Sequence, residues 1–386
     1  MRYDVIVVGA RVAGASTAML LARAGLRVLL LDRGRRGTDT LSTHAFMRAG
    51  VLQLSRWGLL DRIVAAGTPP IASTTFRYPG EEPVTVGHRP SPGVEALYAP
   101  RRDLLDEILV AAAAEAGAEV RHGYAVTDLL RDATGRVCGV VTPHGALRAR
   151  FVVGADGIRS LVATAARARV LASGRNRSAV RYTYLDLAVP GTEWFYGDHA
   201  GGGVIPTNNG AACVFVGSTP ARLRQLWTGD PDRAWRAALE QVAPGHPVAR
   251  ARRTERFRGW SGLPGFLRQA SGPGWVLVGD AGFYKDPMST HGMTDALRDA
   301  ELAANALVAA FDGGTDGGTD GGTAALADFA RQRDSLARPM LEASDEIASF
   351  DWRGAEVAPL VKRLSVAMAD EVTLLEGLPG VEEGVA

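Results

Sequence analysis

The stretch that decides the fold is residues 5–14, which read Val5-Ile6-Val7-Val8-Gly9-Ala10-Arg11-Val12-Ala13-Gly14. Four consecutive apolar residues are typical of a strand that is buried on both faces of a parallel sheet. A glycine-containing turn follows, and residues 15–24 have the composition of a helix that ends at Gly25. Residues 27–31 form a second apolar run, with Asp32 at its carboxyl end. This order predicts a right-handed β-α-β unit.

The turn has the features of a dinucleotide-binding site. Gly9 permits a tight turn, Gly14 lets the helix pack close to the strand, and the helix N-terminus offers N–H groups to a pyrophosphate. Asp32 lies 18 residues after Gly14, near the ~20-residue spacing of a carboxylate that binds ribose hydroxyls. Arg11 replaces the usual middle glycine, and its guanidinium could itself bind phosphate. The alternative is a β-α-β unit without a ligand.

The charge of the chain is nearly balanced, with 43 Lys plus Arg against 42 Asp plus Glu. Neutralising nucleic-acid phosphates requires a basic excess, so we expect no nucleic-acid partner. Cys138 and Cys213 are the only cysteines, which excludes a disulfide framework. Neither has metal-ligand spacing, so we predict no metal site and a reduced, cytoplasmic setting. We expect no membrane span, because no stretch reaches ~18 uninterrupted apolar residues.

The rest of the chain divides into helical, sheet-like and loop-like stretches. Helical patterns occupy residues 48–66, 102–116 and 292–310, and apolar runs typical of strands lie near residue 120 and at 137–141, 151–153 and 275–278. Alternating apolar residues between 176 and 220 predict an antiparallel sheet with one solvated face. The Gly-Gly-Thr-Asp repeats of residues 313–323 predict a flexible surface loop, and residues 324–368 are mostly helical in pattern.

Four later segments carry a resemblance to known flavoproteins. They are Met47-Arg48-Ala49-Gly50-Val51-Leu52, Arg102-Asp103-Leu104-Leu105, the run from Phe151 through Asp156-Gly157 to Ser160, and Gly279-Asp280-Ala281-Gly282 followed by Pro287 and Gly292-Met293. In this order the chain resembles the FAD-dependent para-hydroxybenzoate hydroxylase-like superfamily. That superfamily contains the class A flavin monooxygenases, the flavin halogenases and the geranylgeranyl reductase-like enzymes.

The resemblance implies an α/β fold, in which a Rossmann-like FAD-binding domain is interrupted by a mostly antiparallel β-sheet domain and followed by a C-terminal helical segment. The FAD-binding domain would comprise residues 1–70, 97–170 and 274–330. The substrate-binding sheet domain would comprise residues 71–96 and 171–273. The helical segment would be residues 331–386.

The resemblance also implies which residues bind FAD, without a covalent link. Asp280 should bind the ribityl chain, and Val126, in the strand-like residues 125–127, should contact adenine through its backbone. Gly292 and Met293 should open a helix whose N–H groups face flavin O2 and N1, where reduced flavin carries negative charge. The implied cofactor-binding residues are Gly9, Arg11, Ala13, Gly14, Asp32, Arg33, Arg48, Arg102, Val126, Asp156, Gly157, Asp280, Pro287, Gly292 and Met293.

Three side chains are candidate catalytic residues: His44, Tyr284 and His291. A histidine near neutral pKa could shuttle a phenolic proton. The alternative is a polar loop residue that is hydrogen-bonded to backbone. The aromatic residues 194–196 could line a pocket or pack in the core.

Within the superfamily, the residues favour a class A monooxygenase. Halogenases carry an N-terminal lysine and a Trp-x-Trp-x-Ile-Pro motif, whereas the first lysine here is Lys285 and only Ile205-Pro206 of that motif remains. The Tyr-x-Trp-x-Phe-Pro motif of the lipid reductases is also absent. The resemblance then implies that NAD(P)H reduces FAD, and that O2 forms a flavin C4a-hydroperoxide which oxygenates an aromatic or otherwise electron-rich small molecule of secondary metabolism.

Several alternatives stay open at this point. The chain could be a reductase or dehydrogenase of the geranylgeranyl reductase-like type, which residues 39–44 and the run from Arg102 to Asp106 also resemble. It could instead be a flavin-binding protein without turnover. The substrate could be free or tethered to coenzyme A or a carrier protein, and the protein could be a monomer or a homodimer.

Overall fold

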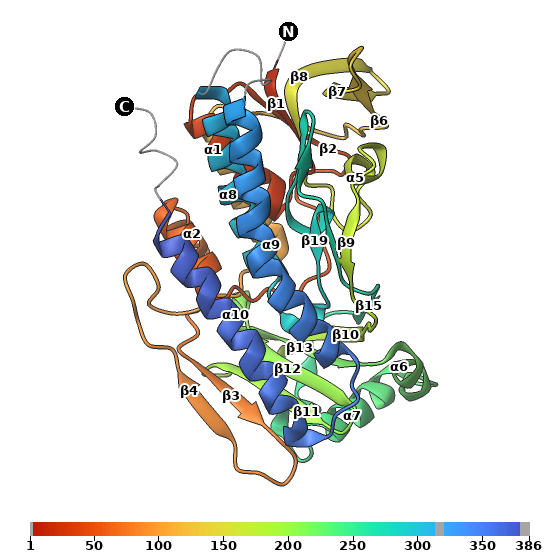
Figure 1. Cartoon of the computed structure of the whole chain (residues 1–386). Helices are drawn as coiled ribbons and strands as arrows, with labels where there is room; N and C mark the ends of the chain where they lie inside the picture. Colours follow the sequence, from red (N-terminus) through yellow and green to blue (C-terminus); the bar gives the residue numbers. More distant parts are fainter. Residues whose placement is uncertain (1–2, 313–319, 379–386) are drawn as a thin grey trace.

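The first sheet is built on the β-α-β unit that residues 5–14 predict. The structure is a computed structural model and describes residues 3–312 and 320–378 (Figure 1). Strand β1 (Tyr3–Val8) pairs in parallel with β2 (Val28–Asp32) and with β8 (Gly145–Gly154). The order is β17-β18-β8-β1-β2-β5, with β5 at Glu119–His122, β17 at Ser271–Gly272 and β18 at Trp275–Leu277. The predicted α/β class is confirmed.

Both faces of this sheet are covered. Helices α1 (Val12–Arg23), α4 (Arg102–Glu115) and α8 (Gly292–Asp312) form one layer, in which α1 contacts the other two. Val5 and Val7 of β1 join the core beneath these helices. Ile6 and Val8 point to the opposite face, where β6 (Asp128–Arg131), β7 (Val137–Thr142) and α5 (Leu161–Ala165) cover them. Burial on both sides explains why residues 5–8 are continuously apolar.

The second sheet is formed mainly by the predicted antiparallel region. Strands β10, β13, β12 and β11 pair in antiparallel order, and β3 adds to β11 in parallel. The order is β14-β10-β13-β12-β11-β3-β4, with β15 beside β10. The bounds are β3 Ser73–Arg77, β4 Val84–Gly87, β10 Ala179–Asp186, β11 Thr192–Gly197, β12 Ala200–Pro206, β13 Ala211–Ser218, β14 Arg252–Arg253 and β15 Arg258–Ser261.

The expectation that this sheet has one solvated face is wrong for its central strands. Every residue of β12 is buried. One face packs against α7 (Pro231–Val242), with α6 (Pro220–Leu226) beside it. The other face joins the main core through side chains such as Tyr182 and Phe215. The alternation in the sequence therefore reflects two different cores rather than a core and solvent.

The C-terminal helices confirm the helical pattern of residues 324–368. Helix α9 (Asp320–Ala348) runs past the small sheet of β9 (Val170–Ser173), β16 (Phe266–Arg268) and β19 (Phe283–Tyr284). Helix α10 (Ala358–Glu376) packs against α9 and α2 (Arg48–Arg56) (Figure 1). Of the predicted loop, residues 313–319 lie outside the described part, and residues 320–323 begin α9 instead, continuous with the alanine-rich stretch that follows. The proposed boundary at residues 330 and 331 falls within α9, and the domain division stays a prediction.

Two local predictions are wrong. Residues 48–66 form two helices, α2 (Arg48–Arg56) and α3 (Leu60–Ala65), because Gly58 takes a φ of +69° and ends the first. Residues 125–127 lie between β5 and β6 and are not a strand. Short 3₁₀ turns are η1 Asn208–Gly210, η2 Pro247–Arg250, η3 Gly279–Ala281, η4 Pro287–Ser289 and η5 Gly354–Val357. Among the described helices, none has the length and apolar character that a membrane crossing needs.

Candidate functional site

The turn between β1 and α1 requires glycine at two positions. Gly9 has a φ of +106°, and a Cβ on Gly14 would lie 1.8 Å from the Gly9 carbonyl oxygen. Helix α1 therefore starts directly against the end of β1. Its N-cap residue is Arg11, whose side chain makes no capping hydrogen bond to any described residue. The N–H groups of the first turn remain available to an anion, so this cradle fits a pyrophosphate.

Asp32 closes the turn from the end of β2. Its two carboxylate oxygens accept hydrogen bonds from the N–H groups of Ala10, at 2.7 Å, and Gly34, at 2.6 Å. Each oxygen keeps a second lone pair for a ribose hydroxyl. The N–H of Tyr124 donates to the Asp32 carbonyl at 2.9 Å, which brings the segment of Val126 to the same end of the sheet. The neighbouring Arg33 is exposed.

A carboxylate that sequence reasoning missed lies among the predicted residues. Asp106 accepts three hydrogen bonds from the Arg102 guanidinium, two at 3.0 Å and one, from Nε, at 3.2 Å. Burial raises the pKa of Asp106, while the positive charges of Arg102 and Arg11 oppose this rise and Asp32 adds to it. The structure thus brings Arg11, Asp32 and Arg102 together around Asp106. The four-residue spacing of Arg102 and Asp106 on one helix was the available signal.

The second flavin motif reaches the same place from the other end of the chain. A Cβ on Gly279 would lie 2.9 Å from the Ala13 Cβ. Asp280 is exposed to solvent, yet the surrounding protein raises the pKa of its carboxyl to about 6, against the opposite effect of Lys285 and Arg102. Its solvent contact limits that effect. Gly292 is also exposed, and a Cβ there would meet no atom within 4 Å. Both residues border accessible space, which fits a ligand.

Other predicted cofactor residues have protein partners. The Asp156 carboxylate accepts from the N–H groups of Leu161, at 2.7 Å, and Val162, at 3.1 Å, at the start of α5. Arg48 donates to the Arg89 carbonyl at 2.8 Å and to the Ser91 hydroxyl at 2.7 Å. The structure therefore directs Arg48 to the loop after β4, away from the glycine turn. Gly157 has a φ of +79°, and Pro287 opens η4. The cofactor roles of these residues stay predictions.

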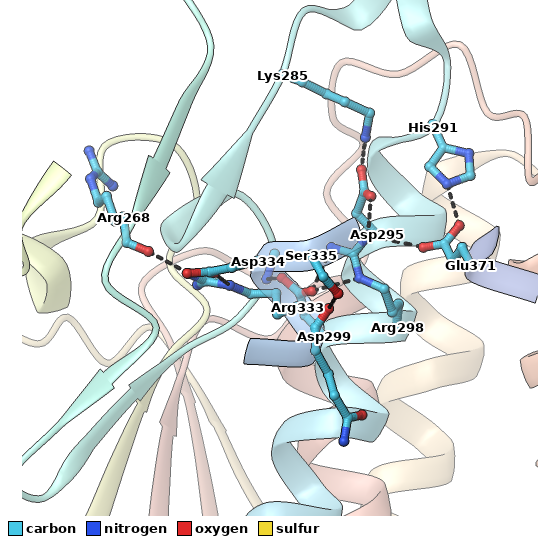
Figure 2. A network of polar contacts seen from close by, with 12 residues as sticks. Arg268, Lys285, His291, Asp295, Arg298, Asp299, Arg333, Asp334, Ser335 and Glu371 are labelled. Atoms are coloured by element: carbon cyan, nitrogen blue, oxygen red, sulfur yellow. Dashed lines mark hydrogen bonds and ion pairs between the residues drawn. The ribbon is translucent and has the colours of Figure 1, made fainter. Parts of the chain in front are cut away.

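His291 belongs to a buried ionic network at the start of α8 (Figure 2). Its Nε2 lies 2.6 Å from a Glu371 carboxylate oxygen on α10. Arg298 donates to Glu371 at 3.0 Å, to Asp295 at 2.7 Å and to Asp299 at 2.7 Å. Lys285 forms an ion pair with Asp295, and Asp299 accepts from the N–H of Gly279 at 3.1 Å. The network joins α8, α10 and η3.

The protonation states of these residues decide whether the cluster is an ionic network or could hold a metal ion. Burial, with Arg298 next to it, lowers the pKa of Lys285 to about 7. Burial lowers the pKa of His291, and we take His291 as neutral and Glu371 as ionised because two cations adjoin both. One nitrogen or oxygen from each of His291, Asp295 and Glu371 lies within 4.8 Å of the others, a spacing that could hold a metal ion. Lys285 and Arg298 already neutralise these carboxylates, so the cluster is an ionic network.

His44 occupies a different environment. It is fully buried, and its Nε2 is hydrogen-bonded to the hydroxyl of Tyr184 on β10. The guanidinium of Arg101 lies 3.7 Å from the centre of the Tyr184 ring and forms an ion pair with Glu255 at 2.8 Å. The third candidate, Tyr284, is also buried and accepts from Trp260 Nε1 at 3.2 Å. The structure does not join the three candidates into one catalytic group.

Sequence reasoning missed Tyr184, Arg101 and Arg258 as possible site residues. The sequence held one signal for Tyr184: it alternates with Tyr182 along a predicted strand, so the two side chains share a face. The aromatic residues 194–196 pack in the core: Phe195 is fully buried, Trp194 lies against Phe215 with ring centres 5.8 Å apart, and Tyr196 stacks on Tyr78.

Comparison with known proteins of similar sequence shows the family of this chain. The FAD binding domain model matches residues 2–342. The probable electron transfer flavoprotein-quinone oxidoreductase YgcN of Escherichia coli is 31% identical over 340 residues, which cover 80% of this chain and 77% of that protein. A digeranylgeranylglycerophospholipid reductase of Methanocella arvoryzae is 28% identical over 319 residues, which cover 78% of this chain and 76% of that protein.

A solved structure supports the fold. The structure of PqsL from Pseudomonas aeruginosa in complex with 2-aminobenzoylacetate superposes with a TM-score of 0.81 at 20% identity, and covers 96% of this chain and 100% of that one. With the family model spanning most of its length, the chain belongs to the FAD-binding domain family of FAD-dependent oxidoreductases.

Proposed function

We propose that the protein is an FAD-dependent monooxygenase that uses NAD(P)H and O2 to oxygenate an aromatic or otherwise electron-rich small molecule. The observation that carries this proposal is the polarity of the sheet face beside the 39–47 loop. That face presents Tyr182, Tyr184 and Arg258, with Arg101 over the Tyr184 ring. These polar groups already bond one another and the loop, so the face suits a polar aromatic compound better than an isoprenoid chain, which offers polar groups no hydrogen bonds.

Strand β12 gives a second argument, which counts against a flavin halogenase and against a geranylgeranyl reductase-like enzyme. The aromatic positions of their sheet motifs precede Ile205-Pro206, and here the corresponding residues are Gly201 and Gly203. A Cβ on Gly201 would lie 3.1 Å from the Met288 methyl, and a Cβ on Gly203 would lie 2.6 Å from the Trp194 ring. Residues from other elements therefore fill the space that those motifs would use.

The chain's own residues would bind, orient and shield the reactants. The glycine cradle and the Arg102–Asp106 pair would hold the pyrophosphate end of FAD, and Asp280 would bind the ribityl chain. The start of α8 would place N–H groups and a partial positive charge at the flavin ring. When bound, FAD would supply hydride acceptance from NAD(P)H and reaction with O2.

A reductase of the geranylgeranyl reductase-like type is the second candidate. The two curated relatives described above favour it, because their names are those of a reductase and a quinone oxidoreductase. A reductase would pass reducing equivalents to its substrate without O2. A flavin-binding protein without turnover would consume no NAD(P)H.

The experiment that separates these functions is a screen of NAD(P)H oxidation under air and under anaerobic conditions. Phenols, aromatic acids and aromatic thioesters are the test compounds, since the substrate could be free or tethered. A monooxygenase should consume NAD(P)H and form product only with O2. Product under anaerobic conditions would favour the reductase, and no oxidation with any compound would favour a protein without turnover. The free cysteines Cys138 and Cys213 support our further proposal of a cytoplasmic setting.

A further inference from the structure

The loop of residues 39–47 connects the sheet to the start of α8. The N–H of Ser42 donates to the Tyr182 hydroxyl at 3.2 Å, and the N–H of Met47 donates to the Thr294 hydroxyl at 3.1 Å. The Ser42 hydroxyl lies 3.8 Å from the sulfur of Met293 and accepts from the N–H of His44 at 2.9 Å. His44 is therefore held between β10 and the helix start that borders the expected flavin position.

The backbone and the ring of His44 both point to function. His44 has a φ of +70°, a left-handed conformation that costs roughly 1–2 kcal/mol in a residue with a Cβ. Such strain persists where the surrounding structure enforces it, often at ligand sites. The ring is fully buried, and Nδ1 has no hydrogen-bond partner among the described residues. A buried nitrogen without a partner is costly unless a ligand supplies one.

Tyr184 decides which nitrogen of His44 carries the proton. Burial raises the pKa of Tyr184 well above its usual value of 10, so the hydroxyl stays protonated. The described residues offer this hydroxyl one acceptor, His44 Nε2. The proton of the neutral imidazole then lies on Nδ1. If Nε2 carried it instead, Nε2–H would donate to the Tyr184 oxygen, and the Tyr184 O–H and the Nδ1 lone pair would both lack a partner among the described residues.

The surrounding charges keep the imidazole neutral. Burial lowers the pKa of His44 well below 6.5, and the cations Arg101 and Arg102 at the start of α4 and Arg258 on β15 add to this effect. These cations are themselves paired: Arg101 with Glu255, Arg102 with Asp106 and Arg258 with Asp39, the last at 2.5 Å. Tyr182 on β10 and Cys213 on β13 face the same cluster and are neutral at pH 7.

A neutral donor among paired charges suits an uncharged oxygen acceptor rather than a carboxylate. We propose that His44 donates a hydrogen bond from Nδ1–H to a carbonyl oxygen of a bound ligand, and that Tyr184 is the positioning residue that fixes this tautomer. The inference rests on the proposed function for the ligand, which is either the flavin ring of FAD or a carbonyl-bearing aromatic substrate. It replaces the proton-shuttle hypothesis for His44 with the role of an uncharged donor.

Two substitutions of His44 test the hydrogen-bond donor at Nδ1 apart from the other contacts of the ring. The amide of His44→Asn can place an N–H near the Nδ1 position, and asparagine tolerates a left-handed backbone. The longer His44→Gln can reach Tyr184 but offers no donor at the Nδ1 position. His199→Gln is the matched control, because His199 also has a left-handed backbone, with φ +57°, and bonds the Phe350 carbonyl at 2.7 Å through Nδ1.

Binding is measured with the full chain for two probes: FAD with the apoprotein, and para-hydroxybenzaldehyde with the FAD-loaded protein. His44→Gln should weaken one of them about three- to tenfold, the loss expected for one hydrogen bond, and His44→Asn should restore it. Weaker FAD binding assigns the oxygen to flavin, and weaker aldehyde binding alone assigns it to substrate. The carbonyl-free para-cresol and the His199→Gln variant should show no change. No difference between His44→Gln and wild type for either probe contradicts the proposal.

Nitrogen NMR of histidine-labelled protein tests the tautomer directly. The His44 signals, identified by their loss in His44→Asn, should show a neutral ring with the proton on Nδ1 at pH 7. Tyr184→Phe should shift the ring toward a mixture of tautomers, an effect that a purely structural tyrosine would not produce. A proton on Nε2, or an imidazolium, in the wild type overturns the inference. None of these measurements needs turnover, so the inference and the proposed oxygenation can fail independently.

Discussion

Asp280 is the exposed carboxyl that we propose to bind FAD. Its side chain borders accessible space while the surrounding protein raises the pKa of its carboxyl to about 6. A carboxylate in such a recess can accept hydrogen bonds from ligand hydroxyls, and its ionised form predominates above that pKa.

We expect Asp280→Ala to weaken FAD binding about ten- to a hundredfold, because one charge-assisted hydrogen bond is worth roughly 1.5–3 kcal/mol. Wild-type affinity should also fall as the pH drops below about 6, and the variant should lack this dependence. Fluorescence titration of the apoprotein with FAD measures both effects. The control is Asp186→Ala, which removes an exposed pair with Arg252 and should bind FAD like wild type. Equal FAD affinity in Asp280→Ala and wild type would remove Asp280 from the site.

At the residue scale, motif positions were predictable and contacts between distant segments were not. Gly9 and Gly14 follow from the turn itself, since their backbone geometry excludes a Cβ. The partner of His44 did not follow, because Tyr184 is 140 residues away and only the pairing of sheet and loop joins them. The same limit applies to His291, whose partner Glu371 lies 80 residues further along the chain.

The approach of α1 to β1 is the element contact on which the cradle depends. A methyl group at position 14 would meet the Gly9 carbonyl oxygen at 1.8 Å, so the helix would have to move. We expect Gly14→Ala to lower the free energy of unfolding by about 3 kcal/mol, the upper end for overpacking, and to weaken FAD retention. Urea unfolding measures the first effect. In the control, Gly87→Ala, the new methyl meets no atom within 4 Å, and similar stability of the two variants would contradict the close packing.

The ionic network fixes α10 against α8 and gives the fold an acid-sensitive contact. Burial opposes ionisation of Glu371, but the hydrogen bond from His291 and the charges of Arg298 and Lys285 outweigh it and hold the pKa of this carboxyl below 4.5. A depressed folded-state pKa contributes stability above the unfolded pKa, and that stability is lost as the pH falls through the folded value.

We therefore expect Glu371→Gln to cost roughly 1.5–3 kcal/mol of unfolding free energy at pH 7, the range for a hydrogen bond to a charged group. The difference from wild type should shrink as the pH falls from about 4.5 toward about 2, because Glu371 is then protonated in the unfolded chain and, near pH 2, in the folded protein as well. Urea unfolding at pH 7 and at lower pH measures it. The control is Glu346→Gln, which breaks an exposed pair with Arg363 between α9 and α10 and should cost at most about 1 kcal/mol. A cost for Glu371→Gln that does not change with pH would contradict the ionised state.

At the element scale, strong periodic patterns predicted whether a segment is a helix or a strand better than they predicted where it begins and ends. The helix of residues 102–116 and the strands of the first sheet appear as expected. The helix expected over residues 48–66 is interrupted because Gly58 adopts a left-handed conformation, which the apolar spacing does not reveal. The solvated face expected for the second sheet is covered by α7 on one side and by the first core on the other, and alternation cannot distinguish two cores from one.

The whole molecule places its candidate chemistry where the two sheets approach each other. The glycine cradle and Asp280 come from the first sheet and the segments after it, and the polar face of Tyr182 and Tyr184 comes from the second (Figure 1). The 39–47 loop links the two through its bonds to β10 and α8. This arrangement would position a small molecule against a bound flavin and exclude water from the reacting atoms.

The measurement that tests the proposed function most directly is product formation in heavy-isotope O2. With NAD(P)H and a substrate from the screen, we expect one heavy oxygen atom in each product molecule, and no product under strict anaerobic conditions. The paired anaerobic reaction distinguishes oxygen transfer from oxygen used only to reoxidise the flavin. Full product formation without O2, with no heavy oxygen incorporated under air, would contradict the monooxygenase and assign the protein to the reductases.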